Sequence, residues 1–283
     1  MRRADLTDEA FRAAMALDPA LPNLRFELAL AYAAAQNYAQ AAALFKQVVA
    51  AEPRNGKAKF QLGSVLSKQG DCAGAVPLLE QAAEGARRHV LLATCLKKLG
   101  REDEAAAEFA RARAAREGAE TRMQAKYRAA VARKQADAGQ LREAVEEYRA
   151  ALALAPDDVA LKIDLAVAWL QLGDKAAVRE LLAGERDPLA RYQLALAAEE
   201  PRTAAALLEQ IVRDRPTFAE AWYQLGVTRA GLGDAAGEEA ALAEATRVRP
   251  DRGAFRAAWA DALARVGRAK DAAEQRRLAG AAR

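Results

Sequence analysis

Residues 219–252, AEAWYQLGVTRAGLGDAAGEEAALAEATRVRPDR, decide the fold of this chain. Apolar residues recur at helical spacing on both sides of the pair Gly233-Asp234. Glycine accepts the left-handed backbone that ends a helix, and aspartate can cap the helix that follows. Pro250 ends the second helix, because a helix interior requires the amide hydrogen that proline lacks. The stretch therefore predicts two antiparallel helices of about 12–14 residues each.

The same unit recurs along the chain with a period close to 34 residues. Pro19 and Pro53 are 34 residues apart, as are Pro216 and Pro250. One helix pair cannot bury both of its apolar faces, so neighbouring pairs must stack and share a core. The expected fold is therefore all-α, built from stacked antiparallel helix pairs. The glycines expected at its turns are Gly70, Gly100, Gly139, Gly173, Gly233 and Gly267.

This pattern resembles the tetratricopeptide repeat family, whose unit places an aromatic residue, Leu-Gly, Tyr, Ala, Phe and Pro at set spacings. Residues 219–252 match it at Trp222, Leu225, Gly226 and Pro250. The resemblance covers essentially the whole chain and implies a right-handed α-solenoid, a single elongated domain over residues 1–283. The implied units are a partial first repeat at 1–21 and repeats at about 22–55, 56–85, 86–119, 125–158, 159–186, 187–218, 219–252 and 253–283.

Departures from the regular spacing indicate where the superhelix should bend. Gly70 and Gly100 are only 30 residues apart, whereas Gly100 and Gly139 are 39 apart. Residues 116–119, Arg-Glu-Gly-Ala, are the expected connector in the longer interval. In a later repeat, residues 199–201, Glu-Glu-Pro, replace the glycine turn, and the first helix should be about one turn short.

Residue types that carry catalysis are sparse. His89 is the only histidine, which argues against histidine-based metal sites and Ser–His catalysis. It is expected at the surface or in a groove, beside Arg87 and Arg88. Cys72 and Cys95 fit neither a zinc motif nor a disulfide framework and are expected to be buried. We predict no enzyme activity, no metal and no cofactor.

The aromatic residues recur at the packing positions of the repeat and are expected in the core. Rings at such positions cannot stack on the bases of a single-stranded nucleic acid, so no nucleic-acid partner is expected. The residues concerned are Tyr32, Phe45, Phe109, Tyr148, Trp169 and Trp222.

Charge is unevenly distributed along the chain. The formal net charge is +4, yet residues 54–134 carry 17 Lys or Arg against 9 Asp or Glu, a local charge of +8. In the family that the chain resembles, first helices line a concave groove, and their residues outside the packing positions face the ligand. Carried over to this sequence, that gives Phe26, Leu30, Lys57, Phe60, Ser64, Lys68, Arg87, Val90, Thr94, Lys97, Lys98, Lys126 and Arg133. A solvated basic face and a groove for an acidic peptide both remain open.

The resulting functional hypothesis is a non-catalytic scaffold or adaptor that binds a peptide or protein segment in its concave groove. Two alternatives stay open. The chain could be a structural subunit of a larger assembly or filament, packed end to end or laterally. It could also be the regulatory region of an enzyme whose catalytic domain lies outside this chain. The N-terminal half-repeat, with Leu6, Phe11, Met15 and Leu17, is a candidate for self-association.

Targeting signals are not evident. Met1-Arg2-Arg3 leads into acidic residues rather than an apolar core, and the uncharged run 28–45 is divided by a turn, so neither a secretory leader nor membrane insertion is expected. A soluble protein is predicted, cytoplasmic by default and periplasmic or extracellular if a leader was removed. The abundance of alanine and arginine is typical of a GC-rich bacterium.

Overall fold

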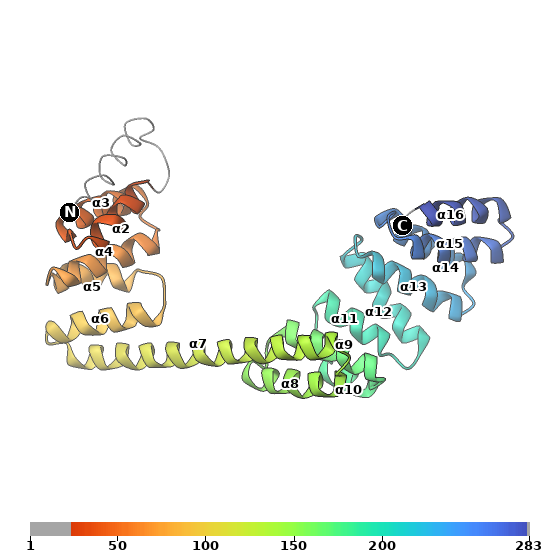
Figure 1. The fold of residues 1–283 in the computed structure, drawn as a ribbon, viewed down its shortest axis with the longest axis horizontal. Helices are drawn as coiled ribbons and strands as arrows, with labels where there is room; N and C mark the ends of the chain where they lie inside the picture. Colours follow the sequence, from red (N-terminus) through yellow and green to blue (C-terminus); the bar gives the residue numbers. More distant parts are fainter. Residues whose placement is uncertain (1–23, 282–283) are drawn as a thin grey trace. The chain divides into compact units, whose positions relative to one another are not determined.

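The structure is a computed structural model, and it describes residues 24–281. Within that range every regular element is a helix (Figure 1), which confirms the expected all-α solenoid of paired helices. The partial first repeat at 1–21, with its four apolar residues, lies outside the described residues. No described helix is both long and apolar enough to cross a membrane.

The chain forms two compact units, residues 1–120 and 121–283. The helices of the first unit are α2 (Leu24–Ala34), α3 (Tyr38–Ala51), α4 (Gly56–Lys68), α5 (Cys72–Glu80), α6 (Ala86–Lys98) and the first half of α7 (Glu102–Asp137). The second unit contains the rest of α7, α8 (Leu141–Leu154), α9 (Val159–Leu172), α10 (Lys175–Leu181), α11 (Pro188–Leu196), α12 (Pro201–Asp214), α13 (Ala219–Gly231), α14 (Ala235–Val248), α15 (Gly253–Arg265) and α16 (Ala269–Ala281).

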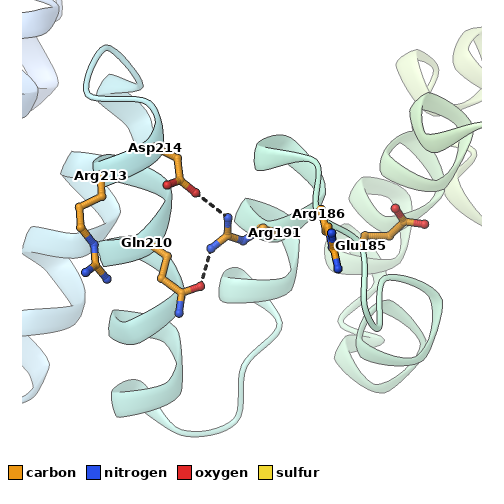
Figure 2. A pocket seen from close by; sticks show the side chains of 6 residues that line it. All are labelled: Glu185, Arg186, Arg191, Gln210, Arg213 and Asp214. Atoms are coloured by element: carbon orange, nitrogen blue, oxygen red, sulfur yellow. Dashed lines mark hydrogen bonds and ion pairs between the residues drawn. The ribbon is translucent and has the colours of Figure 1, made fainter.

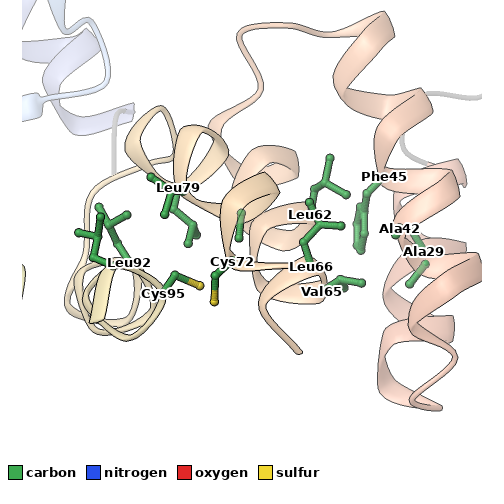
Figure 3. Packing of buried hydrophobic residues seen from close by; sticks show 14 of the residues in the cluster. Ala29, Ala42, Phe45, Leu62, Val65, Leu66, Cys72, Leu79, Leu92 and Cys95 are labelled. Carbon is green, nitrogen blue, oxygen red and sulfur yellow. The ribbon is translucent and has the colours of Figure 1, made fainter. Parts of the chain in front are cut away.

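In the first unit, apolar side chains from successive helices form one core (Figure 3). Phe45 of α3 is fully buried, and its ring packs edge-on against Phe26 with 5.5 Å between the ring centres. Cys72 and Cys95 are buried free thiols in this core, as predicted. Burial, helped by a hydrogen bond with Cys72, raises the pKa of the Cys95 thiol to about 11. Cys95 therefore stays protonated near neutral pH and packs as a small apolar side chain.

In the second unit, the same layering continues from α8 to α16. Tyr148, Leu165 and Trp169 belong to the core of its first repeats. Further along, the ring of Tyr223 stacks on that of Phe255, with 4.9 Å between their centres. Each layer is thin, so stability is expected to accumulate from many small interfaces between neighbouring repeats.

The turns are built as the glycine spacing predicts. All six expected turn glycines have φ between +75° and +89°, in the left-handed region that side chains disfavour. Asp174 follows Gly173 and caps the start of α10. Its carboxylate accepts a hydrogen bond of 3.1 Å from the Ala177 amide. Pro201 occupies the first turn of α12, where its missing amide hydrogen costs nothing. The preceding α11 has 9 residues against 13 in α13, so it is about one turn shorter, as expected.

Replacing Gly173 by valine should lower the free energy of unfolding by about 1 kcal/mol or more, because a β-branched residue opposes φ of +83°. No atom lies near the added Cβ, so the cost is conformational rather than steric. Urea denaturation measures it. Gly231→Val, which also meets open space but has no positive φ, is the matched control. Equal losses in the two variants would contradict the assigned turn.

The prediction of a connector at residues 116–119 is wrong. The segment lies inside α7, a single helix of 36 residues. Its neighbourhood is rich in alanine, arginine and glutamate, which favour helix, and one glycine costs only about 1 kcal/mol there. Arg113 and Glu117 add an i,i+4 ion pair of 2.8 Å. The boundary between the two compact units falls within this helix, and the division of residues 1–283 into eight repeats of one solenoid stays a prediction.

The expectation that the aromatic residues pack in the core holds at five of six positions. Phe45, Tyr148 and Trp169 are buried. Tyr32 and Trp222 are half-buried against their cores. For Phe109 the expectation is wrong, because its side chain is 42% exposed. The helix that carries it continues instead of turning back, so no following helix of the first unit covers the ring.

Candidate functional site

A groove of about 950 Å³ opens on the first unit between α4, α6 and the first half of α7. Six residues predicted from the sequence line it together: Phe60, Ser64, Lys68, Arg87, Val90 and Thr94. On α4 they are four residues apart, and on α6 they are three or four apart. Each set therefore lies along one face of its helix. The opposite faces carry Leu62 and Leu92, which are buried in the core.

Apolar side chains form much of the groove surface. Phe60 and Leu91 are half-buried against the core, whereas Val90 and Phe109 are exposed. The hydroxyl of Thr94 donates a hydrogen bond of 2.7 Å to the backbone oxygen of Val90, so its proton is used within α6. This lining can accept a large apolar side chain of a ligand.

Only part of the positive charge of the groove is neutralised by the protein itself. Lys68 has its ammonium 5.2 Å from the centre of the Tyr38 ring and forms no ion pair within residues 24–281. Arg87 is exposed and has no hydrogen bond or ion pair in the described part of the chain. By contrast, Arg113 and Arg116 on α7 pair with glutamates of the same helix. The cations open to a ligand are therefore Lys68 and Arg87.

The other predicted residues are not among those that line the groove. Phe26 and Leu30 are half-buried against the core of the first unit. Lys57, Lys97 and Lys98 are exposed outside the lining. Lys126 and Arg133 belong to the second unit, where Arg133 binds Asp164 at 2.7 Å.

The sequence did not predict that residues of α7 line the groove. Phe109, Ala112 and Arg113 line the groove because this helix closes the first unit. The 39-residue interval between Gly100 and Gly139 was the one signal that this repeat is irregular.

The expectation that His89 lies at the surface or in the groove is wrong. Its ring is buried between α6 and α7, and Nδ1 lies 2.6 Å from a carboxylate oxygen of Glu108. Burial alone would raise the pKa of Glu108, but hydrogen bonds from His89 and Arg111 hold that pKa below its usual value. Arg88 donates to the backbone oxygen of Leu79 at 3.2 Å. The cluster fastens α6 to its neighbours on either side.

The bridge from His89 to Glu108 has counterparts in other repeats. In four repeats, a polar side chain of the first helix forms a hydrogen bond with a polar side chain of the second helix, 19 residues later in the sequence. The other three pairs are Arg128–Glu147, Arg191–Gln210 and Arg256–Gln275. This spacing, visible in the sequence, would have assigned His89 a structural role.

A second hollow, of about 550 Å³, lies on the second unit, and the six residues that line it are polar or charged (Figure 2). At its centre Arg191 of α11 donates hydrogen bonds to Gln210 and, at 3.0 Å, to Asp214, both on α12. Glu185, at its edge, is held by Lys162 at 2.6 Å. Arg191, Asp214 and Glu185 therefore have partners within the protein, whereas Arg186 and Arg213 of the lining form no ion pair in the described residues.

Groups that could ligate a metal ion do not gather in the described part of the chain. Across residues 24–281, no three His, Cys, Asp or Glu side chains lie where they could share a metal ion.

Comparison with known proteins gives a consistent family match. Residues 26–89, 60–120 and 189–252 match a family model described as tetratricopeptide repeat, and residues 135–198 match a second model with the same description. No curated protein matches the chain.

Some solved structures are similar to part of this chain at low sequence identity. One is MamA, residues 41 to the end, from Desulfovibrio magneticus RS-1. It is 19% identical, with a TM-score of 0.49 over 56% of this chain and 94% of that one. Another is TTC0263, a thermophilic TPR protein from Thermus thermophilus. It is 24% identical, with a TM-score of 0.45 over 53% of this chain and 87% of that one.

Proposed function

Because the chain belongs to the tetratricopeptide repeat family, we propose that it is a protein-interaction scaffold whose first unit binds an acidic segment of a partner protein. The observation that carries this proposal is the groove between α4, α6 and α7, where an apolar surface lies beside two cations without carboxylate partners. A ligand that supplies both an apolar side chain and carboxylates would satisfy the lining and both cations at once.

Each part of the groove has a role in this proposal. Lys68 and Arg87 bind the carboxylates of the ligand through charge-assisted hydrogen bonds. Arg87 can bind a carboxylate with two parallel N–H donors, which fixes its orientation as well as adding affinity. Phe60 and Val90 contact an apolar side chain of the ligand and remove it from water.

The arrangement supports binding rather than acid–base catalysis. Ser64 and Thr94 supply hydroxyls to the groove, but the one histidine of the chain is buried in its bridge to Glu108. A hydroxyl without a neighbouring base is a weak nucleophile.

The combined variant Lys68→Glu and Arg87→Glu should weaken binding of an acidic peptide at least tenfold, or about 1.4 kcal/mol. The probe is a fluorescein-labelled peptide in which Asp and Glu flank a central Leu-Phe pair. Fluorescence anisotropy measures its affinity at low and high salt. The wild-type affinity should fall with salt, and that dependence should flatten in the variant.

Lys270→Glu is the matched control, because Lys270 is an exposed cation of α16 with no ion pair in residues 24–281. A peptide with Lys in place of Asp and Glu controls for the apolar contribution. Equal loss of affinity at the groove and at Lys270 would indicate non-specific charge attraction. A wild-type chain that binds both peptides equally would contradict the proposal.

A further inference from the structure

The two cysteines of this chain lie against each other in the core of the first unit. Cys72 is the first residue of α5, and Cys95 lies in α6, the first helix of the next repeat. A hydrogen bond joins the two thiols, and Figure 3 shows their side chains next to each other. The Cys95 thiol also donates a hydrogen bond of 3.2 Å to the hydroxyl of Ser67 on α4. The spacing of the cysteines in the sequence does not predict this contact, because it depends on how α5 packs against α6.

Packing alone does not require sulfur at either place. Cys95 lies five residues before its turn glycine, where two other repeats have the buried alanines Ala168 and Ala262. Cys72 lies two residues after its turn glycine, where another repeat has Ala235. The chain has cysteine at these two places alone, and the fold brings the two thiols together.

We propose that Cys72 and Cys95 are a latent disulfide, which a small disulfide such as oxidised glutathione forms and which locks α5 to α6. Sulfurs already in hydrogen-bonding contact need only a small closing movement to reach an S–S bond length of about 2.05 Å. The bond closes a loop across two neighbouring repeats, so it stabilises the first unit by restricting its unfolded chain. Because α6 forms one side of the groove, the oxidised unit keeps that side in place. The inference does not depend on what the groove binds.

The route to the buried thiols is local opening of α5. With 9 residues, α5 is the shortest of the helices described in the first unit. Pro77 lies inside it, and proline lacks the amide hydrogen that would bond to the backbone oxygen of Ala73. A short helix that lacks one of its internal hydrogen bonds opens more readily than its neighbours. Opening of α5 moves Cys72 out of the core and uncovers Cys95.

In the closed state, the pair is protected from oxidation. Burial holds the pKa of the Cys95 thiol at about 11, and a protonated thiol is a poor nucleophile. After opening, the thiolate of one cysteine attacks the small disulfide, whose S–S bond breaks and releases one small thiol. The thiolate of the other cysteine then attacks the mixed disulfide and releases the second small thiol. The two cysteines lose two electrons and two protons, which convert the small disulfide into two thiols.

Oxidised glutathione tests the proposal on the full chain, in urea too dilute to unfold it by circular dichroism. The mass of the intact chain should fall by two hydrogen atoms, with no glutathione attached. Trypsin should then release residues 69–87 and 89–97 as one disulfide-linked product, because each of these peptides carries one cysteine. The urea midpoint of the first unit should rise by about 1 M or more, and dithiothreitol should reverse the rise.

Cys72→Ala and Cys95→Ala are the matched controls, because alanine occupies both places in other repeats. Circular dichroism should show each variant folded. Neither variant has a second thiol to bridge, so the same treatment should not raise its urea midpoint. A rise in either variant would overturn the proposal, since the oxidant would then stabilise the chain without the bond.

Three results with the wild-type chain would also overturn it. A folded chain that keeps both thiols after prolonged exposure to the oxidant has no route to the bond. Glutathione attached to each cysteine would show that the two sulfurs do not reach each other. A bond that lowers the urea midpoint would show that it strains the first unit instead of locking it. Peptide binding enters none of these measurements, so their outcome is separate from that of the proposed function.

Discussion

Replacing Phe45 by alanine should lower the free energy of unfolding of the first unit by about 3–5 kcal/mol. The Phe45 ring is fully buried among residues of α2, α3 and α4 and packs edge-on against Phe26. Its removal loses the transfer free energy of the ring, the aromatic contact and the packing around the cavity that remains. Urea denaturation followed by circular dichroism measures the loss.

Phe109→Ala is the matched control, because Phe109 occupies the equivalent place in its own repeat but is exposed. Its loss should stay below about 1 kcal/mol, as at other exposed positions. A loss as large as that of Phe45→Ala would show that Phe109 is covered in solution, contrary to the structure.

The turns were predictable because their cause is local. A helix that ends in a left-handed residue needs glycine at that place, so Gly70, Gly100 and Gly139 mark turns whatever surrounds them. The short α11 was predictable for the same reason, since a proline turn without glycine replaces the usual one.

The course of α7 was not predictable from the repeat period. The period requires a turn between Gly100 and Gly139, whereas the residues around Gly118 are strong helix formers that need no turn. Local propensity prevails here, and the consequence reaches beyond the helix. Phe109 stands at a packing position by sequence, yet nothing in the first unit follows it to complete the packing.

The groove was predictable in part. Phe60, Ser64 and Lys68 followed from the family resemblance, which gives the groove to the first helices, together with helical periodicity, because the core face of α4 is identified by its Leu-Gly pair. The side of the groove that α7 forms was not predicted, because the repeat period placed a turn within what is one continuous helix. His89 was misplaced because its neighbours Arg87 and Arg88 favoured a surface position. Its partner Glu108 is 19 residues away and is identified only by comparison with the other bridged repeats.

An ion pair of the second unit, in which only the glutamate is buried, is the other place where a single change should have a large effect. Arg265→Ala should lower the free energy of unfolding of the second unit by about 2–3 kcal/mol, because it leaves Glu238 buried without its partner. Arg265 of α15 binds both carboxylate oxygens of Glu238 on α14, one at 3.0 Å, and the structure shows Glu238 almost fully buried. The expected loss is at the lower end for broken buried pairs, since Arg265 itself is partly exposed to water. Urea denaturation measures it, and Arg277→Ala, which breaks an exposed pair with Glu274, should leave the free energy of unfolding almost unchanged.

The double variant Arg265→Ala with Glu238→Ala shows whether the buried charge causes that loss. Glu238 lies five residues after its turn glycine, where other repeats have alanine, as at Ala75 and Ala144. An alanine at 238 should therefore pack without a cavity, and the double variant should recover to within about 1 kcal/mol of the wild type. The two changes are then strongly non-additive, with the coupling carried by the charge on Glu238. Additive losses would mean that Arg265 stabilises the second unit through its own packing, because the apolar stem of an arginine can cover a neighbouring helix without any ion pair.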